Sequence, residues 1–440
     1  MEIIGGRPLC RSAKGDGCLA GAEQGGSLAP LPAVGDRSPP LELKHMIGTS
    51  SPSLSSPAYD LAGLRRGIPL LSSVIPMNNC SQAPQTDVTR AAAERYLDSW
   101  NRRGMDWDVW ISEVGLAKRE FARLVNASVD EIAVFSSVSE ATSVVASALD
   151  FTRRRKVIVT EAEFPTVGHV WLAQEPRGAR VAWVPVRDGT IDPADYDSEL
   201  DDDTIIVSAC HGYYLNGFLQ DLRTLVERAH ARGALLYVDA YQTLGTVPVD
   251  VKALDLDFLA SGNLKFLMGM PGIAFLYVRP DLIEQLRPSV TGWFGRSDPY
   301  SFRVKQLDWS STASRFDAGT PPVINAYVAR AGMEIINGIG VGSIRAWLEV
   351  LAQRLIDGGS ARGLTLHGTA DVARKTSTTA FTVPDSHAVE EAMRTRGVIP
   401  SARGPVLRLA PHYYSTTDDV DTALDTLAAV LNEQARQSRR

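Results

Sequence analysis

Short apolar runs alternate with amphipathic segments through the middle of the chain. The runs are KVIVT at 156–160, AWVPV at 182–186, TIIVS at 204–208, LLYV at 235–238, FL at 258–259 and IAFLYV at 273–278. They are rich in Val, Ile and Leu without polar alternation, which is typical of strands buried on both faces of a mainly parallel sheet. Repeated strand–helix–strand units therefore predict a doubly wound α/β domain over residues 86–310.

Helical periodicity accompanies these strands and continues beyond them. Residues 107–125 carry an amphipathic pattern, and apolar positions within 222–229 form one face of a helix that Asp221 opens and Gly233 closes. After about residue 321 the pattern changes. Helices are predicted at 323–337, 341–357, 387–396 and 417–434, with strands at 379–383 and 406–409. This order predicts a smaller α+β domain over residues 311–440.

The N-terminal part of the chain has a different texture. Residues 1–56 are rich in Gly, Ser, Pro and Ala and show no apolar period, so they predict a disordered tail. Residues 57–85 are expected to join the functional site to the small domain.

Composition narrows the class of protein. The chain is 44% hydrophobic and 22% charged, with a net charge of −6, which argues against nucleic acid or an anionic membrane as the main partner. It has no run of 18 apolar residues, so no membrane span is predicted. The 4 cysteines form no CxxC pair, and the 7 histidines lack metal-ligand spacing, so no metal site is predicted. We expect a soluble, reduced, cytoplasmic protein.

Two common nucleotide and hydrolase signatures, GxxxxGK[ST] and GxSxG, are absent from the sequence. The glycine-rich stretch 338–342 resembles a dinucleotide-binding loop by its letters alone. It lies between two predicted helices rather than after a strand, so a connecting turn is predicted there.

The most informative chemistry lies between residues 234 and 277. Asp239 follows an apolar strand, and Lys265 lies in an apolar, glycine-flanked segment. Ligands of open α/β sheets bind beyond the carboxyl ends of strands. An amine in apolar surroundings has a lowered pKa and can form a Schiff base. A pyridoxal phosphate site requires an Asp that pairs with the protonated ring nitrogen and a Lys that forms an imine with the cofactor. Spacing alone leaves open a core Asp and a Lys that extends to solvent.

Four motifs carry a family resemblance. They are Asp239-Ala-Tyr-Gln242, Pro248-Val-Asp250, Ser261-Gly-Asn-Leu-Lys265 and Pro271-Gly272. Over about residues 60–435, the chain resembles the class V aminotransferase and cysteine desulfurase family of fold-type I pyridoxal-phosphate enzymes. The resemblance implies the fold-type I transferase fold and pyridoxal 5'-phosphate as cofactor. It implies that Lys265 holds the cofactor as a Schiff base, Asp239 keeps the ring nitrogen protonated, and Gln242 hydrogen-bonds the phenolic oxygen.

Further residues fit the cofactor under the same resemblance. Ser137, Val138 and Ser139 begin a helix whose amide groups and serine hydroxyl suit the phosphate. An ordinary serine N-cap has the same sequence, so this signal is weak by itself. Phe164 falls where the family places a side chain that stacks on the ring, and Ser261 resembles a further phosphate ligand.

The C-terminal part suggests how a substrate and a second subunit contribute. Thr320, within RFDAGTP at 315–321, resembles the segment that reaches the phosphate from the partner, which implies a homodimer. Arg408 resembles the arginine that binds the substrate carboxylate bidentately. Tyr214 falls where desulfurases usually have Asn. It would donate to the cofactor, shape the pocket or simply pack.

Departures from the desulfurase pattern guide the functional prediction. Leu264 replaces a histidine, and the stretch between Gly397 and Arg408, expected to be a loop, holds no cysteine to form a persulfide. Cys80 is the candidate that would contradict this, and Cys210 ends a buried strand. We expect an amino-acid substrate to react through an external aldimine and a Cα carbanion, with β-elimination of a sulfur-linked group. Transamination is the alternative, followed by epimerisation or decarboxylation, and a non-catalytic relative is a further class.

Overall fold

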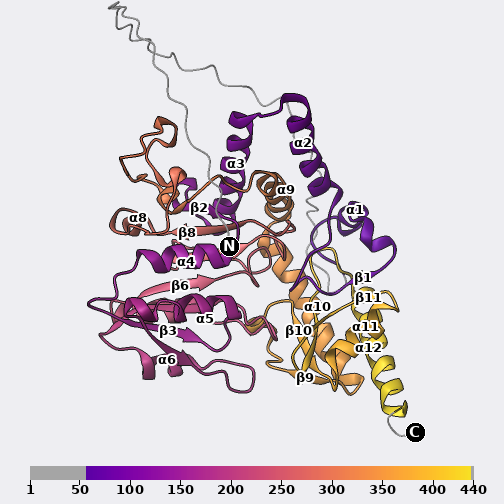
Figure 1. Cartoon of the computed structure of the whole chain (residues 1–440). Coiled ribbons are helices and arrows are strands. Elements are labelled where there is room, and N and C mark those ends of the chain that lie inside the picture. Colours follow the sequence, from indigo (N-terminus) through magenta and orange to yellow (C-terminus); the bar gives the residue numbers. More distant parts are fainter. Residues whose placement is uncertain (1–55, 438–440) are drawn as a thin grey trace, which may run out of the picture. The chain divides into compact units, whose positions relative to one another are not determined.

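The core of the fold is a seven-stranded sheet with the strand order β2-β8-β7-β6-β5-β3-β4. The computed structural model describes residues 56–437, so all but the last residue of the predicted N-terminal tail lies outside the described residues (Figure 1). The strands are β2 (Ile132–Phe135), β3 (Lys156–Thr160), β4 (Arg180–Val184), β5 (Thr204–Cys210), β6 (Leu235–Asp239), β7 (Phe258–Gly262) and β8 (Ala274–Val278). The pairs along β7-β6-β5-β3-β4 are parallel, which confirms the mainly parallel sheet.

Strand β8 runs antiparallel to both of its neighbours, β2 and β7. It is buried on both faces, as β3 and β7 are, so its composition does not reveal its direction. The connection from Gly262 to Ala274 contains no helix, and a parallel return would need a longer crossover. The segment that carries Lys265 is therefore a direct reversal at the carboxyl end of β7.

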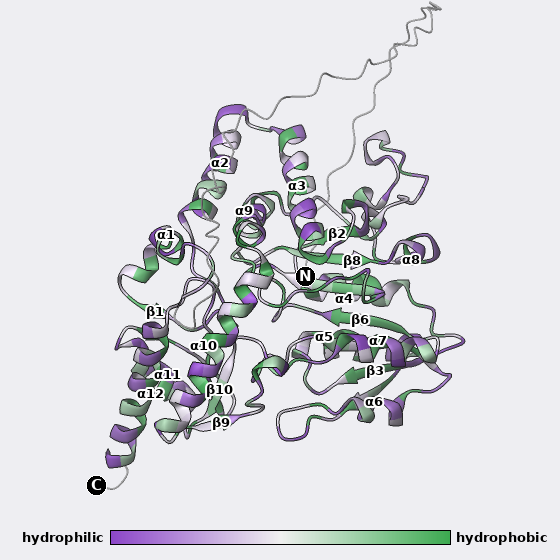
Figure 2. Ribbon diagram, turned by 180° about the vertical axis from the view of Figure 1, so that it is seen from behind, coloured by the Kyte–Doolittle hydropathy of each residue, from purple (hydrophilic) through white to green (hydrophobic). Residues whose placement is uncertain are grey.

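Helices cover both faces of this sheet. On one face lie α4 (Val138–Ala148), α5 (Pro165–Leu172) and α8 (Pro280–Gln285). The other face packs against α3 (Trp107–Val125), α6 (Pro193–Glu199), α7 (Leu222–Ala231) and α9 (Val323–Ile339). Successive side chains of β3 alternate between the two faces of the sheet. Ile158 belongs to the core on the side of α3, α6, α7 and α9, while Val157 and Val159 belong to the core on the side of α4, α5 and α8. Figure 2 shows the central strands as apolar along their length.

Local signals set the ends of several elements. The Asp221 carboxylate accepts hydrogen bonds from the N–H groups of Arg223 and Thr224, which confirms the predicted start of α7. Strand β4 begins and ends two residues earlier than predicted. Pro185 follows its last residue, and proline has no N–H to donate to a strand ladder.

The smaller unit is built on a four-stranded antiparallel sheet of order β12-β13-β10-β9. Its elements are α10 (Val341–Ala361), β9 (Thr365–His367), β10 (Thr379–Thr382), α11 (Ser386–Arg394), β12 (Ser401–Arg403), β13 (Val406–Leu409) and α12 (Thr417–Gln437). The loop expected between Gly397 and Arg408 is instead β11 (Val398–Ile399) and the β12–β13 hairpin. Pro400 and the turn at Gly404 interrupt the sequence pattern and conceal these short strands.

Helix α9 shows how closely the two units are joined. Predicted as part of the small domain, it packs against α2 (Asp87–Arg103) and α3. The boundary between residues 310 and 311 stays a prediction. Helices α9 and α10 meet at Gly340 with a bend of 79°, which confirms the connecting turn. Within residues 56–437 no single helix meets the length and hydropathy needed to cross a membrane, and this bent pair meets them only when the two helices are taken together.

The segment before α2 connects the small unit to the Lys265 segment. It contains α1 (Leu61–Arg66) and β1 (Ile75–Pro76), and β1 pairs in parallel with β11. The Asn79 amide donates to the Ala410 carbonyl at 2.7 Å. The Ala83 N–H donates to the Leu264 carbonyl at 3.0 Å. The chain therefore bridges the small sheet and the residue next to Lys265.

Candidate active site

A cavity of about 420 Å³ lies where the carboxyl ends of β5, β6 and β7 face the small sheet. Its volume falls in the range of small-molecule sites, about 300–1,000 Å³. Cys210 and Asp239 end two of these strands, and Lys265 follows the third. Arg403 and Arg408 reach the cavity from the small sheet. The structure therefore brings Asp239, Lys265 and Arg408 to one site.

Asp239 lies at the base of this cavity. One carboxylate oxygen, Oδ1, accepts the Tyr241 N–H at 2.8 Å, and no other hydrogen bond reaches the carboxylate from residues 56–437. Burial raises the pKa of Asp239, while the nearby Lys265 ammonium opposes that rise. A buried carboxylate with a free oxygen is the group that a protonated ring nitrogen would satisfy.

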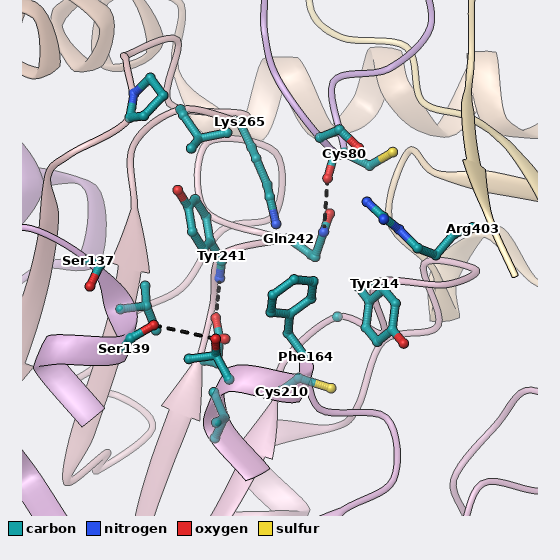
Figure 3. Close-up of a pocket in the computed structure, with 18 of the residues that line it drawn as sticks. Cys80, Ser137, Ser139, Phe164, Cys210, Tyr214, Tyr241, Gln242, Lys265 and Arg403 are labelled. Atoms are coloured by element: carbon teal, nitrogen blue, oxygen red, sulfur yellow. Dashed lines mark hydrogen bonds between the residues drawn. The ribbon is translucent and has the colours of Figure 1, made fainter. Parts of the chain in front are cut away.

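Lys265 points into the cavity from the β7–β8 connection (Figure 3). Its Nζ atom has no hydrogen-bond acceptor among the described residues and lies 4.2 Å from the ring centroid of Tyr241. Burial lowers the pKa of Lys265 to about 8, against the opposing charge of Asp239. A free amine is therefore accessible near neutral pH, as an imine-forming lysine requires.

Tyr241 contacts Lys265, a role that the sequence did not predict. Its ring supports the Lys265 ammonium by a cation–π contact. It also fills the space beside Gly262, where an added Cβ would lie 2.1 Å from the tyrosine ring. Its place between Asp239 and Gln242 was visible in sequence, but its contact with Lys265 depends on the β6–β7 pairing.

The start of α4 forms one wall of the cavity. Ser137 is the N-cap, and its hydroxyl accepts the Glu140 N–H at 3.2 Å. The N–H groups of Val138 and Ser139 occupy the first helical positions, where no helical acceptor exists. The Ser139 hydroxyl donates to Thr166 Oγ1 at 3.4 Å, and both side chains line the cavity. The N-cap role and an anion-binding role are therefore compatible.

Phe164, Tyr214 and Gln242 line the cavity together. The rings of Phe164 and Tyr214 meet edge to face at 5.4 Å, and the Lys265 Nζ lies 5.7 Å from the Phe164 centroid. The Gln242 amide donates to the Cys80 carbonyl at 3.1 Å. Figure 3 shows Phe164 and Gln242 near the end of the Lys265 side chain. Tyr214 lines the pocket and packs against Phe164, and a hydrogen bond from Tyr214 to the cofactor stays a prediction.

Two residues proposed to bind the phosphate lie away from the cavity wall of the described chain. The Ser261 hydroxyl donates to the Gly262 carbonyl at 2.9 Å and is buried. Thr320 is exposed just before α9. Neither residue lines the cavity. Thr320 was expected to act in the site of the partner subunit. The phosphate-binding roles of Ser261 and Thr320 both stay predictions.

Arg408 is almost fully buried on β13, with 1% of its surface exposed. Its guanidinium donates to the Tyr214 carbonyl at 2.7 Å, to Ser81 Oγ at 2.9 Å and to Ser401 Oγ at 2.5 Å. These contacts come from the loop that follows β5, the N-terminal segment and the small sheet. These hydrogen bonds fix the Arg408 guanidinium in one position at the cavity wall.

Two buried cysteines, Cys80 and Cys210, line the cavity. The Cys80 side chain packs with Phe266 and Ala410. The Cys210 thiol donates to the Ala162 carbonyl at 3.3 Å, and burial raises its pKa well above its usual value. Cys10 and Cys18 lie outside the described residues. Among residues 56–437, no group of three His, Cys, Asp or Glu side chains is placed to hold a metal ion.

Comparisons with known proteins place the chain among related sequences and structures. A model of the family Aminotransferase class-V matches residues 87–404. An uncharacterized aminotransferase YcbU from Bacillus subtilis is 34% identical over 83% of this chain and 96% of its own length. A kynureninase from Pseudomonas fluorescens is 28% identical over 88% of this chain and 96% of its own.

The fold has close structural relatives as well. A cysteine desulfurase from Thermococcus onnurineus superposes with a TM-score of 0.77 at 23% identity, covering 84% of this chain and 98% of that one. This likeness confirms the predicted fold-type I architecture. Together with the family match, it identifies the chain as a pyridoxal-phosphate-dependent enzyme of the class V aminotransferase family.

Proposed function

We propose that the protein is a lyase that removes a sulfur-linked group from Cβ of a cysteine-like or S-conjugated amino acid. The observation that carries this proposal is the placement of the cysteines. Cys80 is buried in a cluster with Phe266 and Ala410, the Cys210 thiol donates its proton to the Ala162 carbonyl, and the β12–β13 hairpin has no cysteine. Carbon–sulfur cleavage at this site would therefore release the sulfur with its own fragment rather than as a persulfide.

The residues at the cavity fit pyridoxal phosphate. The free oxygen of Asp239 suits a ring N–H, and the unpaired Val138 and Ser139 amides suit a phosphate. Phe164 would cover one face of the ring, and Lys265 would hold the cofactor covalently. When bound, the cofactor supplies an electron sink for negative charge at the substrate's α-carbon.

The chain's own groups would orient the substrate and move its proton. Arg408 would bind the α-carboxylate, because its position is fixed by three neighbouring segments. Lys265 Nζ, once free, would accept the Cα proton, since its lowered pKa suits a base near neutral pH. Phe164 and Tyr214 would limit the access of water from their side of the cavity.

The proposal is tested by the products that the holoenzyme forms. Elimination with subsequent hydrolysis converts a cysteine S-conjugate and one water into pyruvate, ammonia and a free thiol. We expect pyruvate and thiol in equal amounts. Formation of the intact substrate's 2-keto acid, without thiol, would contradict elimination and would support transamination.

Transamination is the second candidate, and a specific observation favours it. The relative that shares 34% identity with this chain is named as an aminotransferase. The same Lys265, Asp239 and Arg408 would serve that reaction. A homodimer, with Thr320 completing the partner's phosphate site, and a cytoplasmic location also remain our proposals.

The double variant Cys80→Ala/Cys210→Ala is expected to keep its turnover of cysteine conjugates within about threefold of wild type, because neither thiol attacks sulfur in this mechanism. Turnover of cysteine and of its conjugates is measured side by side. Loss of activity, together with a persulfide trapped on Cys80 of the wild type, would show that a protein thiol takes part.

Arg408→Ala is expected to raise KM for the amino acid while the cofactor stays bound. Most Arg408 donors are already engaged by the protein, so we expect a cost of about 2 kcal/mol, or about 30-fold in KM. Arg408→Lys is the matched control, because it keeps the charge but loses the planar fork. An unchanged KM in both variants would remove Arg408 from substrate binding.

A further inference from the structure

A second guanidinium reaches the cavity from the same hairpin as Arg408. Ser401 pairs with Arg408 across the β12–β13 ladder, so these two side chains project from one face of the sheet. Arg403 lies two residues after Ser401 on β12 and therefore shares that face. Both arginines line the cavity, and Figure 3 shows the Arg403 guanidinium pointing toward Gln242 and Cys80.

The two arginines differ in how they are held. Arg408 is buried and donates to Tyr214, Ser81 and Ser401. Arg403 is an exposed residue that lines the cavity, and it has no hydrogen bond or ion pair with any residue in the range 56–437. Burial is the main cause of the lowered Lys265 pKa, and the charges of Arg408 and Arg403 contribute to it in the same direction. A cation held in a cavity without a partner is available to a ligand.

The charges on the cavity wall do not balance. Lys265, Arg403 and Arg408 are basic, and Asp239 is the acidic side chain that lines the cavity within the described chain. Under our assignment, Asp239 would pair with the ring nitrogen, and the start of α4 at Ser139 would hold the cofactor phosphate. The α-carboxylate of a substrate would match Arg408. This leaves Arg403 without an anion.

We propose that Arg403 binds a second anionic group, carried on the substrate's side chain or sulfur substituent. The substrates would then be amino acids with an acidic side chain, a carboxylate in the simplest case. This inference rests on the proposed function in one respect, namely that Arg408 binds the α-carboxylate. An arginine suits the task because its planar donors match a carboxylate in two parallel hydrogen bonds.

The test compares pairs of ligands that differ by an acid and its amide. The pairs are S-(2-carboxyethyl)cysteine with S-(2-carbamoylethyl)cysteine, glutamate with glutamine, and aspartate with asparagine. Dissociation constants are measured from the absorbance change of the holoenzyme's bound cofactor. For at least one pair, we expect wild type to bind the acid at least about tenfold more tightly than the amide.

Variants then test whether Arg403 is the residue that causes the preference for the acid. Arg403→Gln is expected to bring the acid and the amide of that pair within about twofold of each other, and Arg403→Lys to keep part of the preference. Arg408→Ala is expected to weaken both ligands by a similar factor. Arg95→Gln, which removes an exposed charge on α2 outside the cavity, is the matched control and is expected to behave as wild type. Cofactor absorbance and thermal midpoint verify that each variant is folded.

The outcomes separate this inference from the proposed function. Equal binding of acid and amide by the wild type in every pair overturns the inference, even when pyruvate and thiol are formed. Equal weakening of acid and amide in Arg403→Gln overturns it as well. An acid preference that Arg403→Gln abolishes supports it, even when no thiol is released and the elimination reaction is wrong.

Discussion

Lys265→Ala is expected to lower kcat by at least about 10⁴-fold, because one substitution removes both the covalent attachment of the cofactor and the group that moves the Cα proton. In the structure, Lys265 Nζ reaches the cavity without a hydrogen-bond acceptor among the described residues, beside Tyr241 and Phe164. Borohydride reduction of the wild type should fix the cofactor to the peptide that contains Lys265. Turnover and peptide mass measure the two effects.

Lys252→Ala is a matched control, since Lys252 is exposed and outside the cavity. It should keep both the colour and the turnover of wild type. A label on another lysine, or a yellow and active Lys265→Ala protein, would refute the assignment of the cofactor lysine and with it the proposed mechanism.

The lowered pKa of Lys265 predicts how the rate of cofactor uptake depends on pH. Burial lowers the pKa of Lys265 to about 8, so the ammonium predominates below that pH and the free amine above it. The rate of cofactor uptake by the apoprotein should rise by about tenfold per pH unit up to that value and then level off. A rate that is independent of pH between 6 and 9 would contradict a lowered pKa at the attacking amine.

The parts of the site that sequence predicted are those fixed by local pattern. Asp239 ends a strand whose apolar run shows its burial, and Lys265 lies in an unusual apolar, glycine-flanked segment. The start of α4 follows from Ser137 as an N-cap. Strands β3 and β13 were predicted with their observed bounds, since most of their positions are buried and apolar.

The parts that sequence missed depend on pairing between distant segments. The direction of β8 is fixed by its neighbours rather than by its composition. Arg403 was assigned no role because residues 397–408 were interpreted as a loop. Only the pairing of Ser401 with Arg408 shows that Arg403 faces the site. Tyr241 and Thr166 reach the cavity through similar long-range contacts.

Asp239→Asn is expected to lower kcat by about 10²–10³-fold while part of the cofactor stays bound, because the amide keeps the shape but cannot hold a proton on the ring nitrogen by charge. The carboxylate is buried, so its interaction with a ring N–H would be little screened by water. Asp239→Ala should behave similarly, with weaker retention of the cofactor. The measurements are kcat, and the cofactor bound per subunit after gel filtration.

Glu163 provides the control that isolates this charge. It is buried near Asp239, and both burial and the Asp239 charge raise its pKa well above its usual value, which favours the uncharged carboxyl. Glu163→Gln keeps the size and shape of this buried side chain and leaves the Asp239 carboxylate in place, so we expect kcat within about threefold of wild type. Comparable losses in Glu163→Gln and Asp239→Asn would indicate that packing beneath the cavity, rather than the Asp239 charge, controls turnover. A near-normal kcat in Asp239→Asn would exclude Asp239 as the partner of the ring nitrogen.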